Sequence, residues 1–324
     1  MALTLSELQA ITDHYVESTD NDIYFKSNVM LWKLMGSKER GIKTVPGGKK
    51  IQVVLEYAAS NTGAYGANSE LPTTKKEIFN AAFFPWAAYY GQITVDLDDQ
   101  RQNNGDLAIV NLVNGKTKNA QKSIRNTMGT QIYNQRSANT GPQGETDVGF
   151  NGLGDLFNST SSTAYGEIAE DDMDVWAANI MTGAKTMGFS FLQELRREAS
   201  IDDNAEGKPN LYITTEVLKD SFENSLHTQA RYSDVKLVNA GFDNIMFGGA
   251  PVVTDNKQTS GYVDALNLEY LDVLTHTDYN FTKPVWSTPI NQPDIKVAFI
   301  RWSGNLVCRN RRAHARASNV SAAS

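Results

Sequence analysis

The chain has 324 residues, of which 40% are hydrophobic, so it can bury a large core, and its length suggests about two domains. Its 30 basic and 37 acidic residues give a formal net charge of −7, which argues against a protein whose main surface grips a nucleic acid backbone. A single cysteine, Cys308, excludes an intramolecular disulfide framework and suits a reducing cytoplasm. Because the N-terminus lacks the pattern of a signal peptide and no stretch approaches the roughly 18 apolar residues of a membrane span, we expect no membrane partner.

The first hundred residues predict an extended arm followed by a projecting hairpin. Residues 1–46 mix short apolar patches with charged stretches without a sustained period, which predicts an extended N-terminal arm. Apolar and polar residues then alternate over 51–57 and again over 92–97, which predicts a strand and its return strand. The residues between the two runs are rich in turn formers and end in the polar run 73–77, so we expect a solvated loop tip in an isolated chain.

Aromatic residues crowd the returning side of this hairpin and need a surface to cover. Two interpretations stay open: the ring side chains are buried in the protein's own core, or part of them packs on an adjacent subunit. The residues are Phe79, Phe83, Phe84, Trp86, Tyr89 and Tyr90.

A long helix is predicted next. Asn104 is a good N-cap, and apolar residues recur at helical spacing from Leu107 to Met128, which predicts a helix of about 25 to 30 residues. The Gly/Ser/Thr-rich stretch 141–166 follows and marks a domain boundary.

Beyond that boundary, helices and short strands alternate. We expect helices over 189–199 and 215–226, a buried strand at 211–214, and two short strands over 297–307 around the turn 303–305. The fold class is therefore α+β.

Catalytic and metal-binding patterns are missing from the sequence. Gly115-Lys116-Thr117 resembles the end of a phosphate-binding loop, but Val110 occupies the place of the required earlier glycine. The four histidines are scattered and only one cysteine is present, so no ligand pair has the spacing of a metal site. We expect no enzyme activity and no cofactor.

Taken in order, several segments make the chain resemble tailed-phage major capsid proteins of the Hong Kong 97 type, over nearly its whole length. The most specific match is the run from Gly241 to Asp255. The segments are Gly47-Gly48-Lys49-Lys50-Ile51 with Tyr57, Ala81-Ala82-Phe83 with Trp86, Asn104-Gly105-Asp106 with Leu112, Tyr165-Gly166-Glu167-Ile168 with Trp176, Gly241-Phe242, Phe247-Gly248-Gly249-Ala250-Pro251-Val252-Val253 with Asp255, Asn267-Leu268, Gln292, Gly304-Asn305-Leu306-Val307 and Asn310-Arg311-Arg312.

The resemblance implies a Hong Kong 97-like α+β capsid fold made of an arm, an extended loop called the E-loop, a peripheral domain with a long spine helix, and an axial domain. The expected division is an N-terminal arm at 1–46, the E-loop hairpin at 47–98, the peripheral domain with its spine helix at 99–150, the axial domain at 151–266, the return to the peripheral domain at 267–312, and a C-terminal tail at 313–324.

The function implied is that of a major capsid protein, which self-assembles as hexamers and pentamers into the icosahedral head shell around the double-stranded DNA genome of a tailed phage. The implied location is the virion capsid, after assembly in the host cytoplasm. The resemblance further implies a scaffolding protein, a portal and a decoration protein as partners, and packaged DNA held without sequence specificity. Two alternatives stay open: the shell protein of an encapsulin-like nanocompartment, and a soluble enzyme with an unrecognised site.

Two sets of residues are candidates for contacts in such a shell. The E-loop set, expected to lie across a neighbouring subunit, is Tyr65, Leu71, Lys75, Lys76, Phe79, Phe83 and Trp86. A basic cluster near the C-terminus, accompanied by His314, is expected to face either DNA phosphates or acidic faces of neighbouring subunits; its candidates are Arg309, Arg311, Arg312 and Arg316.

Overall fold

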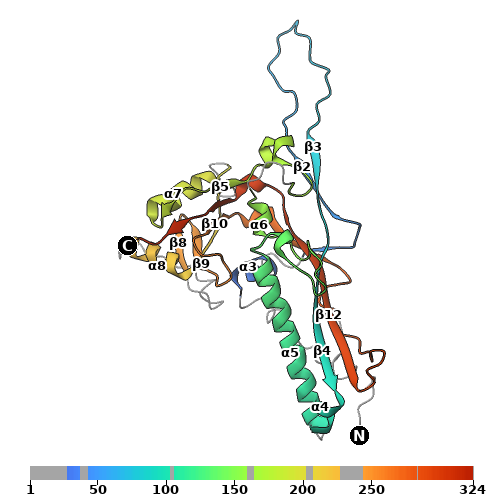
Figure 1. Ribbon diagram of the computed structural model, residues 1–324. Helices are drawn as coiled ribbons and strands as arrows, with labels where there is room; N and C mark the ends of the chain where they lie inside the picture. Colours follow the sequence, from blue (N-terminus) through green and yellow to red (C-terminus); the bar gives the residue numbers. More distant parts are fainter. Residues whose placement is uncertain are drawn as a thin grey trace.

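The computed structural model describes residues 28–36, 43–102, 106–158, 164–201, 207–226, 244–282 and 284–323, without the side chains of 100–111 and 244. Figure 1 shows three parts: a long blade that contains α5, β4 and β12, a lobe that contains α7, α8 and several short strands, and a hairpin whose loop projects from the body.

The blade is a four-stranded sheet in the order β1-β11-β12-β4. Its longest pairing is between β12 and β4. These strands are antiparallel along the whole length of β4, from Ile295 opposite Asp96 to Gly304 opposite Ala87. Side chains along β4 alternate between buried and exposed, as expected for a sheet with one covered face. The strands are β1 (Lys43–Val45), β4 (Ala87–Asp96), β11 (Leu271–His276) and β12 (Ile295–Cys308).

Helix α5 (Asp106–Gln131) covers the buried face of β4 and confirms the predicted long helix. Gly91 on β4 permits the close approach, because a Cβ there would lie 2.7 Å from Cδ1 of Ile124. Val113, Ala120 and Met128, at the predicted helical spacing, are buried. The proposed N-cap Asn104 lies outside the described residues, and a short helix, α4 (Leu97–Gln102), precedes α5.

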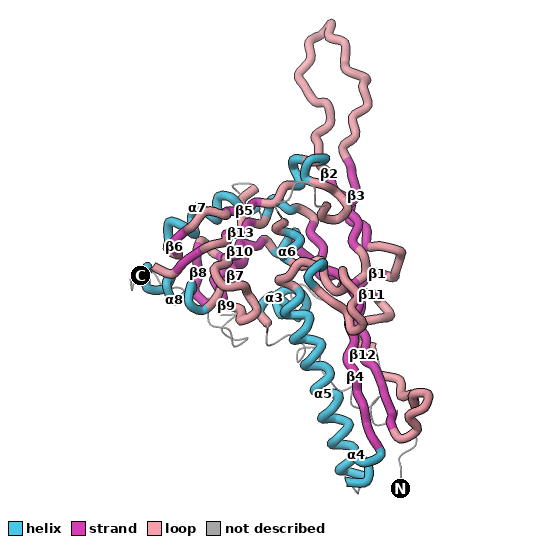
Figure 2. The backbone as a smooth tube through the Cα atoms, viewed as in Figure 1, coloured by secondary structure: helices cyan, strands magenta, loops and turns pink. Residues whose placement is uncertain are grey.

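The lobe is a six-stranded sheet in the order β5-β13-β10-β7-β9-β8, with helices α7 and α8 packed beside it. Figure 2 shows these helices at the edge of the molecule, away from the blade. Both helices and strand β7 confirm the predictions at 189–199, 215–226 and 211–214. The elements are β5 (Asn179–Met181), β7 (Leu211–Thr214), β8 (Asn244–Phe247), β9 (Ala250–Thr254), β10 (Val263–Leu266), β13 (Ala315–Ala317), α7 (Phe189–Glu198) and α8 (Glu216–Ser225).

The hairpin prediction was right in kind and wrong in its return strand. Strand β2 (Ile51–Glu56) pairs with β3 (Phe79–Phe84), whereas the alternating run ending at Leu97 belongs mostly to β4 in the blade. The run 92–97 alternates clearly between apolar and polar residues because β4 has one buried face. In β3 the small residues Ala81 and Ala82 interrupt such an alternation, so the sequence does not show this strand as clearly. β4 therefore belongs to the sheet of the blade and not to the β2–β3 hairpin, although the range 47–98 expected for that hairpin included it.

Three further expectations were wrong. Residues 297–307 form part of one continuous strand, because Gly304 serves close packing rather than a turn: a Cβ there would lie 2.4 Å from the carbonyl oxygen of Leu274. Part of the N-terminal arm is helical, with Asn28 capping α3 (Val29–Leu31) before a π-helical turn at Trp32–Gly36. The C-terminal residues are no tail, since β13 lies between β5 and β10, and β14 (Val320–Ser321) pairs with β6 (Lys185–Thr186).

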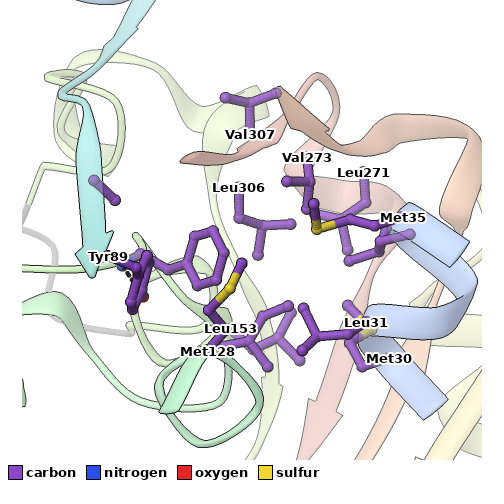
Figure 3. Close-up of a cluster of buried hydrophobic side chains, with 14 of the residues drawn as sticks. Met30, Leu31, Met35, Tyr89, Met128, Leu153, Leu271, Val273, Leu306 and Val307 are labelled. Carbon is purple, nitrogen blue, oxygen red and sulfur yellow. Dashed lines mark hydrogen bonds between the residues drawn. The ribbon is translucent and has the colours of Figure 1, made fainter. Parts of the chain in front are cut away.

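The core at the centre of the molecule joins segments from the whole chain. Figure 3 shows Met30, Leu31 and Met35 from the N-terminal helical turn meeting Leu153 from α6 (Leu153–Leu156) and Leu306 from β12. Because each of these side chains is at most 5% exposed, the N-terminal segment is an integral part of the core.

Hydrogen bonds also connect the lobe to this core. The hydroxyl of Tyr133, just beyond α5, donates to Oδ2 of Asp255 in the lobe at 2.7 Å. The amide of Asn28 donates to Oδ1 of the same carboxylate at 3.4 Å. Burial raises the pKa of Asp255, so these donors compensate for the loss of water around its charge.

His314 is a second buried polar group at the base of the lobe. Its Nδ1 accepts a hydrogen bond from the backbone N–H of Asn267 at 3.1 Å, and its carbonyl oxygen accepts one from the side chain of Asn179. Complete burial lowers the pKa of His314 to about 3, so the ring is neutral and is not part of a basic cluster.

We expect His314 to make the folded state sensitive to mild acid. As pH falls below about 6.5, the unfolded chain binds a proton at this ring that the folded chain does not bind, so the free energy of unfolding should fall by about 2 kcal/mol between pH 7 and pH 5. In His314→Asn, which keeps an acceptor oxygen, this part of the pH dependence should vanish. Urea unfolding of the wild type and of His314→Asn at pH 7 and pH 5 measures this change. If the difference in free energy of unfolding between the two proteins were the same at both pH values, the expected role of His314 would be contradicted.

Candidate functional site

The most distinctive feature of the molecule is the loop between β2 and β3, residues 57–78, which we call the E-arm. The β2–β3 ladder runs from Ile51 opposite Phe84 to Glu56 opposite Phe79, and a bond from Tyr57 N–H to the carbonyl oxygen of Ile78, at 3.0 Å, closes it. Past this point the two halves of the loop separate and extend away from the body, as Figure 2 shows.

The base of the hairpin is fixed to the body. The backbone N–H of Phe83 donates to the carbonyl oxygen of Gly166 at 2.9 Å, and the Lys50 ammonium pairs with the Glu167 carboxylate. Phe84 is buried with its ring edge-on to that of Tyr165, the centroids 5.2 Å apart. The projecting loop therefore has a rigid mount.

The E-arm itself lies in solvent. Every residue from 59 to 77 is exposed, including two large apolar side chains, Tyr65 at 71% and Leu71 at 61%. Among the described residues, the hydrogen bonds of the loop are internal, such as that from the Asn61 amide to the Thr74 carbonyl oxygen at 3.2 Å. Lys75 and Lys76 are also exposed on the returning half.

The aromatic flank is only partly buried in the subunit's own core. Phe84 and Tyr89 are buried in the subunit's own core, where Tyr89 packs against Phe150 and Trp302. Phe79 and Tyr90 remain 61% and 52% exposed.

The two other predicted aromatic residues of the E-loop set are partly covered. Phe83 is half-buried next to the turn that holds the hairpin base. Trp86 donates from Nε1 to the carbonyl oxygen of Gly48 at 2.8 Å and packs edge-on to His276, so it stabilises the start of the hairpin within the subunit.

For two of the four arginines the expected DNA or neighbour contact was wrong. Arg311 is fully buried: it pairs with Glu170 at 2.8 Å and donates to three backbone carbonyl oxygens, among them that of Leu156. Arg316 is 6% exposed and forms a bidentate salt bridge with the buried Asp264, in which Nε donates to Oδ1 at 2.6 Å and Nη2 donates to Oδ2 at 2.8 Å. When a cation is buried, arginine is favoured over lysine because its planar guanidinium can bond carboxylate and carbonyl oxygens at once, and the sequence alone does not reveal such burial.

The other two arginines reach the surface. Arg309 is 48% exposed and shares the buried carboxylate of Asp272 with Lys43, at 2.9 and 2.8 Å, which leaves an excess of positive charge there. Arg312 is exposed. The basic cluster is therefore smaller than predicted.

The single cysteine of the chain lies in the core. Cys308 is buried, and burial raises the pKa of its thiol to about 12, which disfavours the reactive thiolate. No group of three or more potential metal ligands occurs among the residues that the structure describes. In the same part of the chain, no helix has the length and hydropathy needed to cross a bilayer.

Comparison of sequences finds no match for the chain, whereas comparison of structures finds similar solved proteins. No family model matches the chain, and no curated protein matches it in sequence. The capsid asymmetric unit of cyanophage A-1(L) is similar, with a TM-score of 0.66 and 14% identity over 86% of this chain and 90% of that chain. Mycobacterium phage Patience is similar with a TM-score of 0.55 and 12% identity, over 98% of this chain and 89% of that chain. The satellite phage P4 procapsid is similar with a TM-score of 0.55 and 10% identity, over 99% of this chain and 92% of that chain.

The chain therefore has the fold of tailed-phage capsid proteins. The mixed helix and sheet architecture agrees with the predicted α+β class and with the Hong Kong 97-like capsid fold that the resemblance implied. At identities of this order the likeness shows the fold and leaves the role of individual residues to be argued from the structure.

The buried pair Arg316–Asp264 gives a direct test of the corrected arginine assignment. Arg316→Met should lower the free energy of unfolding by about 3 to 5 kcal/mol, because the carboxylate of Asp264 would be left buried without its cation. Adding Asp264→Asn should restore part of the loss. Denaturant unfolding measures both changes, with Arg312→Gln as the matched surface control, expected to stay within about 0.5 kcal/mol of the wild type. Equal effects of the Arg316 and Arg312 substitutions would contradict a structural role for Arg316.

Proposed function

We propose that the chain is a major capsid protein, which self-assembles as hexamers and pentamers into the icosahedral head shell around the double-stranded DNA genome of a tailed phage. The observation that carries the proposal is the E-arm: a long loop, exposed from residue 59 to 77 and bearing large apolar side chains, on a fixed base in a chain with a capsid-protein fold.

The physical argument is that the E-arm gains most by lying on another copy. Apolar area removed from water contributes about 25 cal/mol per Å² before the costs of association. One such contact is weak, but repetition around a closed symmetric shell makes it collectively stable. Exposed Tyr65, Leu71 and Phe79 would then become buried interface.

We assign the parts of the subunit accordingly. The E-arm with β2 and β3 would be the E-loop, the blade with α5 the peripheral domain, and the lobe the axial domain. Lys75 and Lys76 would pair with carboxylates or water at the interface. Their exposed ammonium groups on the returning half support that role.

We propose the shell's other partners at the level of their chemistry. Arg309 and Arg312, which are exposed, are the remaining candidates for contact with phosphates of packaged DNA or with acidic faces of neighbouring subunits. A scaffolding protein, a portal and a decoration protein are proposed further partners. The chain would act in the virion after assembly in the host cytoplasm, as a structural protein rather than an enzyme.

Expression of the chain, alone and with its neighbouring genes, followed by sizing and negative-stain electron microscopy, tests the proposal. Closed shells or rings of five and six subunits are the expected result, with DNA as the content of shells from infected cells. Shells loaded with a host enzyme and free of DNA would favour a nanocompartment, and a strictly monomeric product in every condition would contradict a shell function.

Placing charge on the apolar positions of the E-arm should stop assembly without unfolding the subunit. In Tyr65→Asp/Leu71→Asp we expect a melting temperature within a few degrees of the wild type, because both side chains are exposed in the subunit, and loss of shells in micrographs. Thr62→Asp adds a charge to the same loop without removing apolar area, so it serves as the control and should assemble. Normal shells from the double variant would contradict the role of the E-arm.

A further inference from the structure

Strand β4 lies at the edge of the blade sheet, and its free side can be assigned from the hydrogen-bond pattern. On β12, Val297 exchanges both backbone bonds with Ser287, at 2.9 Å each, on the side away from β4. Thr94 is the residue opposite Val297, so its own N–H and C=O point away from β12. The bond from the Lys116 ammonium to the Thr94 carbonyl oxygen, at 2.8 Å, lies on that free side.

The same orientation repeats at every second residue of β4. Ala88, Tyr90, Gln92 and Thr94 therefore turn their backbone groups outward, and among the described residues no backbone partner is found for their N–H groups. The side chains of Ala88, Tyr90 and Gln92 are exposed as well. A long, unpaired edge of this kind is a template for the addition of another strand.

A groove of about 1240 Å³ runs beside this edge, between β4 and α5. It extends along β4 from Ala88 to Thr94, a length of about 20 Å at the usual rise of a strand. The wall on α5 includes the short residues Gly115, Asn119 and Ser123, which leave room for a backbone. Pockets for small molecules are usually about 300 to 1,000 Å³, so the dimensions suit a segment of chain better.

We propose that the returning half of the E-arm of a second copy, residues 71–77, enters this groove and adds a strand to the edge of β4. The inference rests on the proposed function and specifies how the E-arm would bind. The segment has the length of the groove, is exposed throughout, and among the described residues its backbone has no regular pairing.

The donor must be another copy. In Figures 1 and 2 the E-arm leaves the body in the direction opposite to the part of the blade where α5 and β4 run side by side. A contact between two different surfaces of the same chain is heterologous and generates rings when the rotation closes, as a capsomer requires.

The side chains of the segment also suit the groove. Lys75 or Lys76 would approach Glu145, a carboxylate that lines the groove, and Leu71 would cover apolar surface along β4. The backbone bonds would give affinity, and these side chains would fix the register.

Cysteine cross-linking in assembled shells tests strand addition specifically. Gln92→Cys is combined in turn with cysteine at Thr73, Thr74, Lys75, Lys76 and Glu77, and each shell preparation is oxidised and run on a non-reducing gel. Because successive residues of a strand face opposite sides, we expect subunit ladders at alternate positions, several-fold stronger than at the positions between them. Cys308 should not interfere, since it is buried and burial raises the pKa of its thiol to about 12.

Ile290→Cys, 90% exposed at the loop before β12, replaces Gln92→Cys in the control pair and should not cross-link to the E-arm. Shells without cross-links to position 92, or with equal cross-linking at every position, would overturn strand addition and leave the capsid function intact. Failure of the wild-type chain to form shells under any condition would instead overturn the proposed function itself.

A proline pair provides a second measurement. Gln92→Pro removes an outward N–H and should fold, because proline is tolerated where the N–H of an edge strand faces solvent, but it should not form shells. Ile93→Pro removes an N–H directed at β12 and should unfold the blade. Circular dichroism and micrographs report the two properties separately, and normal shells from Gln92→Pro would contradict the proposal.

Discussion

Backbone polar groups and large apolar side chains need partners, and this fold depends on where they are found. Within the blade, β12 satisfies one side of β4 along its whole length, and α5 covers its inner face. The outer edge of β4 and the E-arm are left to water in the single subunit. A chain that leaves both surfaces open on rigid supports is suited to binding copies of itself, and this requirement links the fold to the proposed function.

The rest of the subunit keeps these open surfaces in place. The hairpin base is fastened through Phe83 and Gly166, and the N-terminal helical turn fills the core beneath the blade. Arg311 and Arg316 hold the C-terminal strands to the body through buried polar bonds. Buried arginines of this kind stabilise a single arrangement of segments that lie far apart in sequence. The subunit can therefore present the E-arm without depending on it for its own folding.

The hydrophobic pattern of the sequence predicted many of the helices and strands, but it did not predict which strands pair with each other. Helices α5, α7 and α8 follow from periodicity, because each has one covered face, whereas strand β7 follows from a short apolar run that is buried throughout. The partner of β2 was assigned incorrectly because alternation reports a buried face and not a neighbour. Tyr65 and Leu71 were expected to lie in a turn-rich loop that reaches across a neighbouring subunit, and both are exposed in the single subunit, whereas Arg311 and Arg316 are indistinguishable in sequence from surface arginines. The free edge of β4 had no sequence signal, since it depends on the sheet order.

Hydrogen–deuterium exchange tests the central claim most directly, by comparing unassembled subunits with assembled shells. The account predicts fast exchange of the E-arm amides, and of the outward amides of β4 at Tyr90, Gln92 and Thr94, in the subunit. In shells both sets should be protected together, while the amides of β4 that pair with β12 stay protected in both states. Equal exchange of the E-arm in the two states would contradict the claim that this chain completes its hydrogen bonds and its apolar contacts only on another copy.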